Sequence, residues 1–211
     1  MIELKGITKK FAGELVFENF DLTVAEGDFL CLAGPSGVGK TTMLNVMSLI
    51  ERPTEGKVKI DGISKWSSSV IQKLRREKIG YVFQNYGLIE NDNVEQNLLL
   101  TSKFAPFKKS KRQYVFVQAL IEVGLDESYL RRKIYSLSGG EQQRVALARL
   151  LITRPKYIFA DELTGNLDAD NREVVFGLLE RFVQQGHTVV YVSHDAALIE
   201  RGKRVVRLEK G

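Results

Sequence analysis

The sequence contains a single cysteine, Cys31, so no disulfide bond can form within the chain. Cys31 lies in an apolar segment, and we expect a buried, unreactive thiol in a protein of a reducing compartment. No apolar run approaches the ~18 residues that a membrane-spanning helix needs, so a membrane role would need a partner. The charged start of the chain, Met1 to Lys5, is strand-like and does not resemble a signal peptide. Internal repeats and low-complexity linkers are also missing, and 211 residues therefore predict one domain, or one domain with an inserted lobe.

The bulk composition is that of an ordinary folded protein. Apolar residues make up 44% of the chain and charged residues 27%, as is typical of soluble globular proteins. The formal net charge of +5 is modest for this length. It fits attraction to a nucleotide or to an anionic membrane surface, and it does not by itself indicate nucleic-acid binding.

The most informative stretch lies between an apolar run, Phe29–Ala33, and a helix-forming run, Thr42–Ile50. Its sequence has the spacing of a phosphate-binding P-loop, in which glycines let the backbone approach phosphate oxygens and the following helix N-terminus favours an anion. We expect Lys40 to reach the β- and γ-phosphates and Thr41 to ligate Mg²⁺. The nucleotide contacts predicted in this stretch are Gly34, Pro35, Ser36, Gly37, Val38, Gly39, Lys40, Thr41 and Thr42.

Polar residues also follow three further apolar strands. These are Ile79–Phe83 before Gln84, Tyr157–Ala160 before Asp161 and Glu162, and Thr188–Val192 before His194. Strands separated by helices favour a parallel sheet, and open parallel sheets bind ligands beyond the carboxyl ends of their strands. We therefore expect all these side chains to meet the glycine-rich loop at one edge of an α/β sheet.

The residue types suggest roles at that edge. We expect Asp161 to hold Mg²⁺, partly through water, and Gln84 to orient the attacking water or a water on the metal. Glu162 should point differently, because adjacent strand residues alternate faces, and it can polarise the attacking water. We expect His194 to donate to the γ-phosphate as charge develops. The other histidine, His187, has no partner motif and is expected to be structural.

The rest of the chain gives a coarse secondary-structure prediction. Further strands are expected at Ile2–Lys9, Leu15–Val24, Lys57–Ile60 and Arg204–Leu208, and further helices at Ser67–Lys78, from a Ser138 cap to Ile152, and at Asn171–Gln185. Phe11 lies at the turn that joins the first two strands.

The segment from Asn85 to Tyr135 has no good strand pattern, and we interpret it as an inserted helical lobe. Helices are expected near Val94–Lys103, Lys109–Val123 and Glu127–Leu130. Its basic clusters are interpreted as solvated helix faces. Its aromatic residues are interpreted as core, although basic and aromatic residues together also occur on nucleic-acid surfaces; they are Phe104, Phe107, Tyr114 and Phe116.

The stretch Leu137-Ser138-Gly139-Gly140-Glu141-Gln142 resembles the signature motif of the ATP-binding cassette (ABC) family. The glycine-rich loop, Gln84, the Asp161-Glu162 pair and His194 also follow in that family's order. The resemblance covers essentially the whole chain. It implies a P-loop NTPase fold: a mainly parallel sheet with helices on both faces, an N-terminal antiparallel β part within residues 1–87, a helical insert at 88–135, and the remaining core at 136–211.

The resemblance also implies the function and partners. It implies an ATPase subunit that uses ATP and Mg²⁺, lies at the inner face of the cell membrane, and drives an integral-membrane permease docked on the helical insert. It implies that Phe11 stacks on adenine and that two copies form a homodimer in which Asp168 communicates between them. The signature residues would bind the γ-phosphate held by the opposite subunit; they are Ser138, Gly139, Gly140 and Glu141.

Within the family, Thr164 to Asp168 resembles the branch that serves lipoprotein release, macrolide export and small bacteriocin export, and Asn85 to Glu90 resembles the bacteriocin exporters. Leu163 replaces the usual proline, so we expect a more mobile loop there without loss of hydrolysis. The alternative is a soluble ABC ATPase that acts on DNA or the ribosome, but the long coiled coil or second cassette of those proteins is not found, and no direct nucleic-acid partner is expected. A kinase or GTPase would not explain the signature motif.

Overall fold

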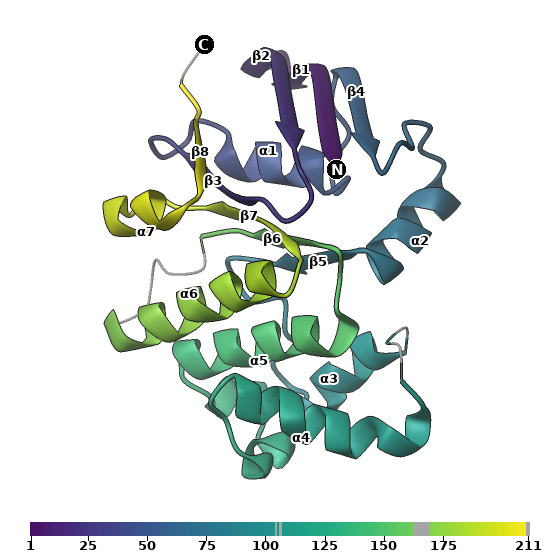
Figure 1. Ribbon diagram of the computed structural model, residues 1–211, viewed down its shortest axis with the longest axis vertical. Helices are drawn as coiled ribbons and strands as arrows, with labels where there is room; N and C mark the ends of the chain where they lie inside the picture. Colours follow the sequence, from purple (N-terminus) through teal and green to yellow (C-terminus); the bar gives the residue numbers. More distant parts are fainter. Residues whose placement is uncertain (104, 106, 163–168, 210–211) are drawn as a thin grey trace.

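The computed structural model describes residues 1–103, 105, 107–162 and 169–209. Its centre is a five-stranded sheet in the order β5-β6-β7-β3-β8, in which every neighbouring pair is parallel (Figure 1). The strands are β3 (Phe29–Ala33), β5 (Ile79–Val82), β6 (Tyr157–Ala160), β7 (Thr188–Val192) and β8 (Arg204–Arg207). The parallel sheet expected from the sequence is confirmed, and the carboxyl ends of β3, β5, β6 and β7 share one edge.

A second, antiparallel sheet of three strands lies above the first in Figure 1, in the order β2-β1-β4. It contains β1 (Ile2–Phe11), β2 (Glu14–Val24) and β4 (Glu55–Ile60). The turn between β1 and β2 places Ala12 and Gly13 at φ 48° and 90°, which is the backbone that a tight two-residue hairpin requires. β1 therefore ends at Phe11, and the phenyl ring of Phe11 lies at the turn.

Helices cover both faces of the parallel sheet. The helix α1 (Lys40–Met47) lies between the two sheets, and α2 (Ser68–Glu77) lies beside β5. Below the sheet in Figure 1 lie α5 (Gly139–Thr153) and α6 (Ala169–Gln184), and α7 (Ala196–Arg201) lies beside β8. The segment between β5 and α5 contains α3 (Val94–Ser102), α4 (Arg112–Glu122) and the short 3₁₀ turns Lys109–Lys111, Glu127–Arg131 and Ile134–Ser136. None of the described helices is both long and apolar enough to cross a bilayer.

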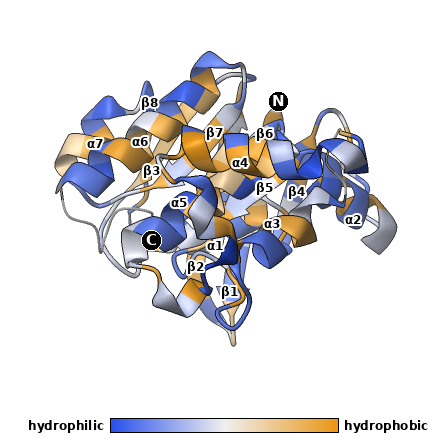
Figure 2. Cartoon of the chain, turned by 90° about the horizontal axis from the view of Figure 1, so that it is seen from below, coloured by the Kyte–Doolittle hydropathy of each residue, from blue (hydrophilic) through white to orange (hydrophobic). Residues whose placement is uncertain are grey.

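The parallel sheet separates two apolar cores, because successive side chains of each strand point to opposite faces. Leu30, Leu32 and Val190 pack with α1 and the antiparallel sheet, whereas Cys31 and Val189 pack with α5 and α6. Figure 2 shows the hydrophobic colour concentrated on β3, β6, β7 and α6. Cys31 is fully buried, and burial raises the pKa of its thiol to about 11, as expected of an unreactive structural cysteine.

Some sequence-based expectations need correction. The apolar strand expected at Ile79–Phe83 ends at Val82 and lies at the edge of the sheet, where Ile79 and Tyr81 are only partly buried. The helix expected at Lys109–Val123 is divided, with a 3₁₀ turn before α4. Of the aromatic residues expected in the core, Phe116 is 1% exposed but Tyr114 is 67% exposed, since residues two apart lie on opposite faces of a helix. Phe104 lies outside the described residues.

Candidate nucleotide-binding site

The glycine-rich loop leaves β3 and closes around the side chain of Lys40, the first residue of α1. The Lys40 ammonium donates to the main-chain carbonyls of Gly34 at 3.0 Å and Pro35 at 2.9 Å, and the residue is only 5% exposed. Gly39 caps α1 with φ 97°, and a Cβ there would lie 2.5 Å from Val16 Cγ1 on β2. The loop therefore needs glycine at this position both for its backbone and for its contact with β2.

Asp161, directly after β6, meets Thr41 of α1 across the sheet edge. The Thr41 hydroxyl donates to Asp161 Oδ1 at 3.0 Å, and Asp161 is 5% exposed. Burial raises the pKa of this carboxyl and the charge of Glu162 adds to the rise, while the Thr41 hydrogen bond opposes it. The Asp161 carboxylate and the Thr41 hydroxyl together offer two oxygen ligands of the kind that Mg²⁺ prefers. This pair lies beside the phosphate loop.

Glu162 turns away from Asp161 into the open side of the site. Its backbone has φ 43°, a left-handed conformation that is uncommon outside glycine, asparagine and aspartate. Gln84, after β5, donates to Glu162 Oε2 at 3.4 Å, and His194 Nδ1, after β7, lies 3.6 Å from Glu162 Oε1. Each oxygen of this carboxylate thus faces a different polar partner, and the predicted convergence of Gln84, Glu162 and His194 is observed.

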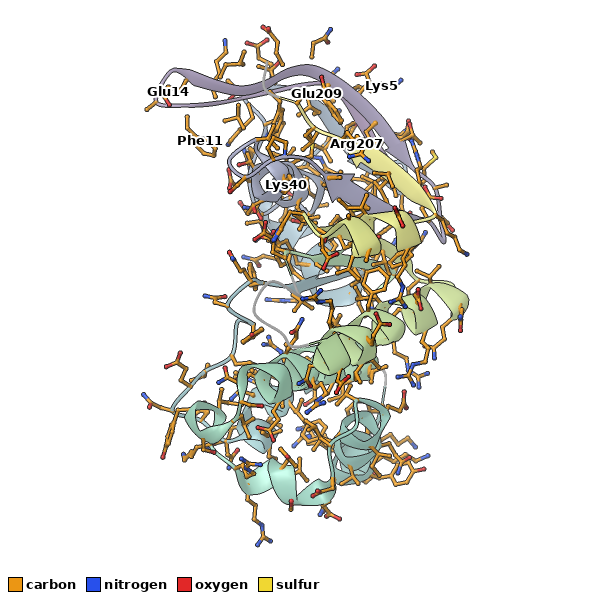
Figure 3. All side chains as sticks on the ribbon, turned by 90° about the vertical axis from the view of Figure 1, so that its left-hand side faces the viewer. Lys5, Phe11, Glu14, Lys40, Arg207 and Glu209 are labelled. Atoms are coloured by element: carbon orange, nitrogen blue, oxygen red, sulfur yellow. The ribbon has the colours of Figure 1, made fainter. Side chains whose placement is uncertain are left out.

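A cavity of about 440 Å³ opens over these groups. It brings together nine residues that the sequence predicted and one that it did not, Val16; the predicted ones are Phe11, Ser36, Gly37, Gly39, Lys40, Thr41, Thr42, Gln84 and Glu162. Phe11 is 46% exposed and projects from the β1–β2 turn on the side where Lys40 lies (Figure 3). An aromatic ring and a phosphate-type loop thus line the same cavity.

The signature motif lies at the N-terminus of α5 and does not line this cavity. Ser138 caps the helix: its Oγ accepts from the Glu141 amide at 3.3 Å, and Glu141 Oε2 accepts from the Ser138 amide at 2.7 Å. The expected capping box is confirmed. A Cβ on Gly140 would lie 2.9 Å from the Asn171 side chain, so a larger residue there would disturb α6. Asp168 lies outside the described residues.

Sequence reasoning missed three residues around the site. Lys9 lies over the Phe11 ring, 4.5 Å from its centroid, and Val16 packs under the glycine-rich loop. Asn171 contacts the signature helix, where Arg144 Nη1 donates to its Oδ1 at 3.0 Å. Lys9 was detectable, because residues two apart on a strand share a face. The contacts of Val16 and Asn171 with the site arise from tertiary packing, and no local sequence pattern predicts them.

His187 directly precedes β7, at the opposite end of that strand from His194. Its Nδ1 contacts the carbonyl of Pro155 at 2.5 Å, and its ring meets the Phe182 ring edge-on. The expectation that His187 is structural agrees with these contacts.

Comparison with known proteins agrees with this geometry. Residues 17–165 match the family model described as ABC transporter. The chain is 39% identical to the uncharacterized ABC transporter ATP-binding protein MJ0796 of Methanocaldococcus jannaschii, over all of this chain and 94% of that protein. It is 36% identical to the uncharacterized ABC transporter ATP-binding protein YvrO of Bacillus subtilis, again over all of this chain and 94% of the relative.

Other relatives are larger. The chain is 37% identical to the macrolide export ATP-binding/permease protein MacB of Bdellovibrio bacteriovorus, but it spans only 33% of that protein's length. These names support a transporter rather than the DNA or ribosome alternative.

The solved structures give the same result. The dimeric structure of a post-hydrolysis state of the ATP-binding cassette MJ0796, bound to ADP and Pi, has a TM-score of 0.90 and 37% identity over 99% of this chain and 94% of that one. A second dimeric structure of MJ0796, described as a bacterial ABC transporter cassette, also has a TM-score of 0.90, with 38% identity. The chain therefore belongs to the ABC transporter family, as an ATP-binding and ATP-hydrolysing subunit.

Proposed function

We propose that the cavity holds Mg²⁺-ATP, that two copies of the chain close on two ATP molecules, and that this cycle drives an export permease. The observation that carries the proposal is the convergence of Lys40, the Thr41–Asp161 pair and the Glu162–His194 pair at one sheet edge. Phe11 would stack on the adenine ring, with Lys9 over the opposite face of the phenyl group. The loop amides would cradle the phosphates.

The donor set beside the phosphate loop fits Mg²⁺. Thr41 and Asp161 would hold the ion, with Gln84 contributing at its outer side, and the ion would supply charge neutralisation for the phosphates. The Lys40 ammonium would exchange its carbonyl partners at Gly34 and Pro35 for phosphate oxygens. This exchange needs only movement of the Lys40 side chain, because its ammonium already lies at the loop.

Hydrolysis requires a water molecule to attack the γ-phosphorus while the bond to the bridging oxygen of ADP breaks. Glu162 is the group placed to accept the proton of that water, since its carboxylate borders the open cavity and not the metal pair. His194, on the far side of Glu162, would donate to a γ-phosphate oxygen. Gln84 would hold the water in line through its contact with Glu162.

The signature helix supports a shared site. Ser138, Gly139, Gly140 and Glu141 lie at the N-terminus of α5, outside the cavity, and would form a second anion-binding site there. The relative MJ0796 has been solved as a dimer. We propose that each signature motif, with Asp168, completes the site of the other copy across a two-fold axis. Hydrolysis then removes the γ-phosphate bridge and lets the copies separate, which is the mechanical step.

The proposal of a permease partner and its cargo is supported by the names of relatives and by the helical insert. All three of the relatives described above are named as ATP-binding proteins, and the larger one is also named as a macrolide export permease. We propose that residues 88–135, with the groove beside Gln84, form a subdomain that docks a cytoplasmic helix of an exporter for peptides, lipoproteins or drugs. Residues 1–87 and 136–211 would form the nucleotide-binding core, held at the inner face of the membrane by that contact.

The variant Glu162→Gln tests the shared site. It keeps the shape and polarity of the side chain but loses the basic carboxylate, so it should bind ATP, hydrolyse it slowly and accumulate as a dimer with Mg²⁺-ATP but not with ADP. Sedimentation velocity measures the dimer, with Glu162→Gln/Lys40→Ala as the matched control that should remain monomeric. A Glu162→Gln variant that stays monomeric at high concentration with saturating Mg²⁺-ATP contradicts the proposal.

A further inference from the structure

The aromatic ring and the phosphate loop of the candidate ATP site come from different parts of the fold. Phe11 ends β1 of the antiparallel sheet, whereas Lys40 and the glycine-rich loop belong to α1 and the parallel sheet. Figure 3 shows Phe11 projecting on the side where Lys40 lies. Binding costs less when both groups are already held in place, so contacts that tie the Phe11 ring to α1 bear on affinity.

Lys9, two residues before Phe11 on β1, contacts the phenyl ring. Residues two apart on a strand share a face, and the Lys9 ammonium lies 4.5 Å from the centroid of the ring. Phe11 lines the cavity, and Lys9 is not among the described residues that do so. The ammonium therefore meets the ring from outside the cavity, as a cation–π contact that leaves the ring open to a purine inside it.

The Lys9 ammonium is itself held in place. Its Nζ donates to the carbonyl of Arg52 at 2.9 Å and forms an ion pair with Glu51 Oε2 at 3.2 Å. A lysine has three N–H donors, so the ring, the carbonyl and the carboxylate together can occupy all of them. The side chains of Lys9 and Glu51 are only 11% and 28% exposed, and water therefore screens this pair less than it screens an ion pair on the open surface.

Glu51 is anchored in turn to the parallel-sheet part of the molecule. Its Oε1 accepts from Asn45 Nδ2 at 2.9 Å, and Asn45 Oδ1 accepts from the Tyr81 hydroxyl at 2.8 Å. Asn45 lies on α1, the helix that follows the phosphate loop, and Tyr81 lies on β5. Burial raises the pKa of Tyr81 and nearby carboxylates add to the rise, so the phenol remains a donor. A continuous chain of polar contacts thus runs from the Phe11 ring to α1 and β5.

We propose that the Lys9–Glu51 ion pair positions the Phe11 ring for adenine, and that it raises the affinity of the site for the base of the nucleotide but not for its phosphates. The inference rests on the proposed placement of adenine on Phe11, and it adds two positioning residues that lie outside the cavity. A ring that is held in the stacking position before binding loses less freedom when the purine arrives. An ion pair that only held α1 against the antiparallel sheet would affect the binding of base and phosphates alike.

A comparison of ATP with inorganic triphosphate separates these two possibilities. Lys9→Met keeps the length of the side chain but removes its charge, so the affinity for ATP should fall about three- to tenfold while the affinity for inorganic triphosphate stays that of the wild type. Titration with a ribose-labelled fluorescent ATP analogue, followed by competition with each ligand, measures both affinities. Retained binding of inorganic triphosphate also shows that the variant is folded.

Two further variants refine the test. Glu51→Gln keeps an acceptor for Asn45 but removes the charge that faces Lys9, so it should also weaken the binding of ATP alone. Lys9→Met/Glu51→Gln should bind ATP no more weakly than Lys9→Met, because the two residues act through one contact. Lys59→Met is the matched control: it breaks an ion pair with Glu3 in the same sheet, at 3.0 Å, and should bind both ligands like the wild type.

Wild-type ATP affinity in Lys9→Met, or an equal loss of affinity for ATP and inorganic triphosphate, overturns the inference. Additive losses in the double variant also overturn it, since Glu51 would then act by a route other than Lys9. Phe11→Ala tests the placement of adenine separately, and it should weaken the binding of ATP but not of inorganic triphosphate. If Phe11→Ala weakens ATP binding and Lys9→Met does not, the proposed function stands without this inference. If Phe11→Ala binds ATP like the wild type, the placement of adenine and this inference both fail.

Discussion

At the scale of single residues, the site contains two buried charged side chains, Lys40 and Asp161, whose hydrogen-bond partners are neutral groups. Lys40 is an almost fully buried ammonium whose partners are two neutral carbonyls. Burying a charge without a charged partner costs free energy, and a phosphate would reduce that cost. Asp161 is the complementary group, a buried carboxylate whose pKa is raised mainly by burial. The charge of Lys40 partly opposes that rise. Bound Mg²⁺-ATP would give each of the two groups a charged partner in direct contact.

Replacing Lys40 should remove most of the ATP affinity. Lys40→Ala removes the point charge that we propose faces the β- and γ-phosphates, and we expect binding to weaken by about a hundredfold or more. Titration with a fluorescent ATP analogue measures the affinity. Lys10→Ala, an exposed lysine at the end of β1, is the control and should bind like the wild type. Wild-type affinity in Lys40→Ala would show that the cavity is not the phosphate site.

Asp161→Asn separates metal binding from nucleotide binding. Asparagine still accepts the Thr41 hydrogen bond but carries no charge for the ion, so Mg²⁺-dependent turnover should fall much more than nucleotide binding without Mg²⁺. Steady-state hydrolysis at varied Mg²⁺ and binding in EDTA measure the two quantities. If both fall equally, Asp161 has a structural role only.

The candidate site residues were largely predictable, because the ends of the strands and the P-loop spacing constrain where they lie. Glu162 contacts both Gln84 and His194 because β6, which precedes Glu162, lies between β5 and β7 in the sheet, and this strand order was not predicted. The left-handed backbone of Glu162 was not predictable, since no local pattern at a glutamate signals it. The same holds for Val16, which reaches the loop from a different sheet.

At the scale of elements, local signals placed most helices and strands within a few residues. The capping box at Ser138 set the start of α5, and uninterrupted apolar runs marked β3, β6 and β7. The strand order was not predicted, because it depends on pairing between distant segments. That order explains why β5, with a short apolar run like those of β6 and β7, lies half-exposed at the edge of the sheet.

The contact between β5 and α5 can be tested at Gly80. In Gly80→Ala the new methyl would lie 2.5 Å from Leu150 Cδ2 and 2.7 Å from Pro155 Cγ, and the proline ring cannot move freely. We expect the free energy of unfolding to fall by about 1–3 kcal/mol, as measured by urea denaturation. Gly177→Ala in α6 is the matched control: nothing lies within 4 Å of its new Cβ, so stability should rise by about 0.5–1 kcal/mol. Equal effects at the two positions would contradict the close packing.

At the scale of the whole molecule, one chain carries both of the surfaces that we propose for the γ-phosphate. The glycine-rich loop lines the cavity, while the signature helix N-terminus lies outside it. A site formed within one chain would work equally well at any dilution. A site formed between chains requires an encounter.

The specific ATPase activity should therefore rise with protein concentration and then level off. Initial rates at saturating Mg²⁺-ATP over a dilution series measure this dependence. In Ser138→Arg the bulky cation would obstruct the signature surface without touching the cavity, so activity should stay low at every concentration while ATP binding persists. Constant specific activity across the series would place catalysis within a single chain.

The parallel sheet is also a partition between two cores, and this has a consequence for local opening. Leu30 and Cys31 are adjacent in β3, yet they belong to different cores. Fluctuations that loosen the packing around α5 and α6 need not loosen the packing around α1, since only the backbone of the sheet joins them. The strand amides can exchange with solvent only when both sides give way, so β3 and β7 should form the slowest-exchanging unit of the chain. The glycine-rich loop after β3 and His194 after β7 are therefore attached to the strands that we expect to open least often.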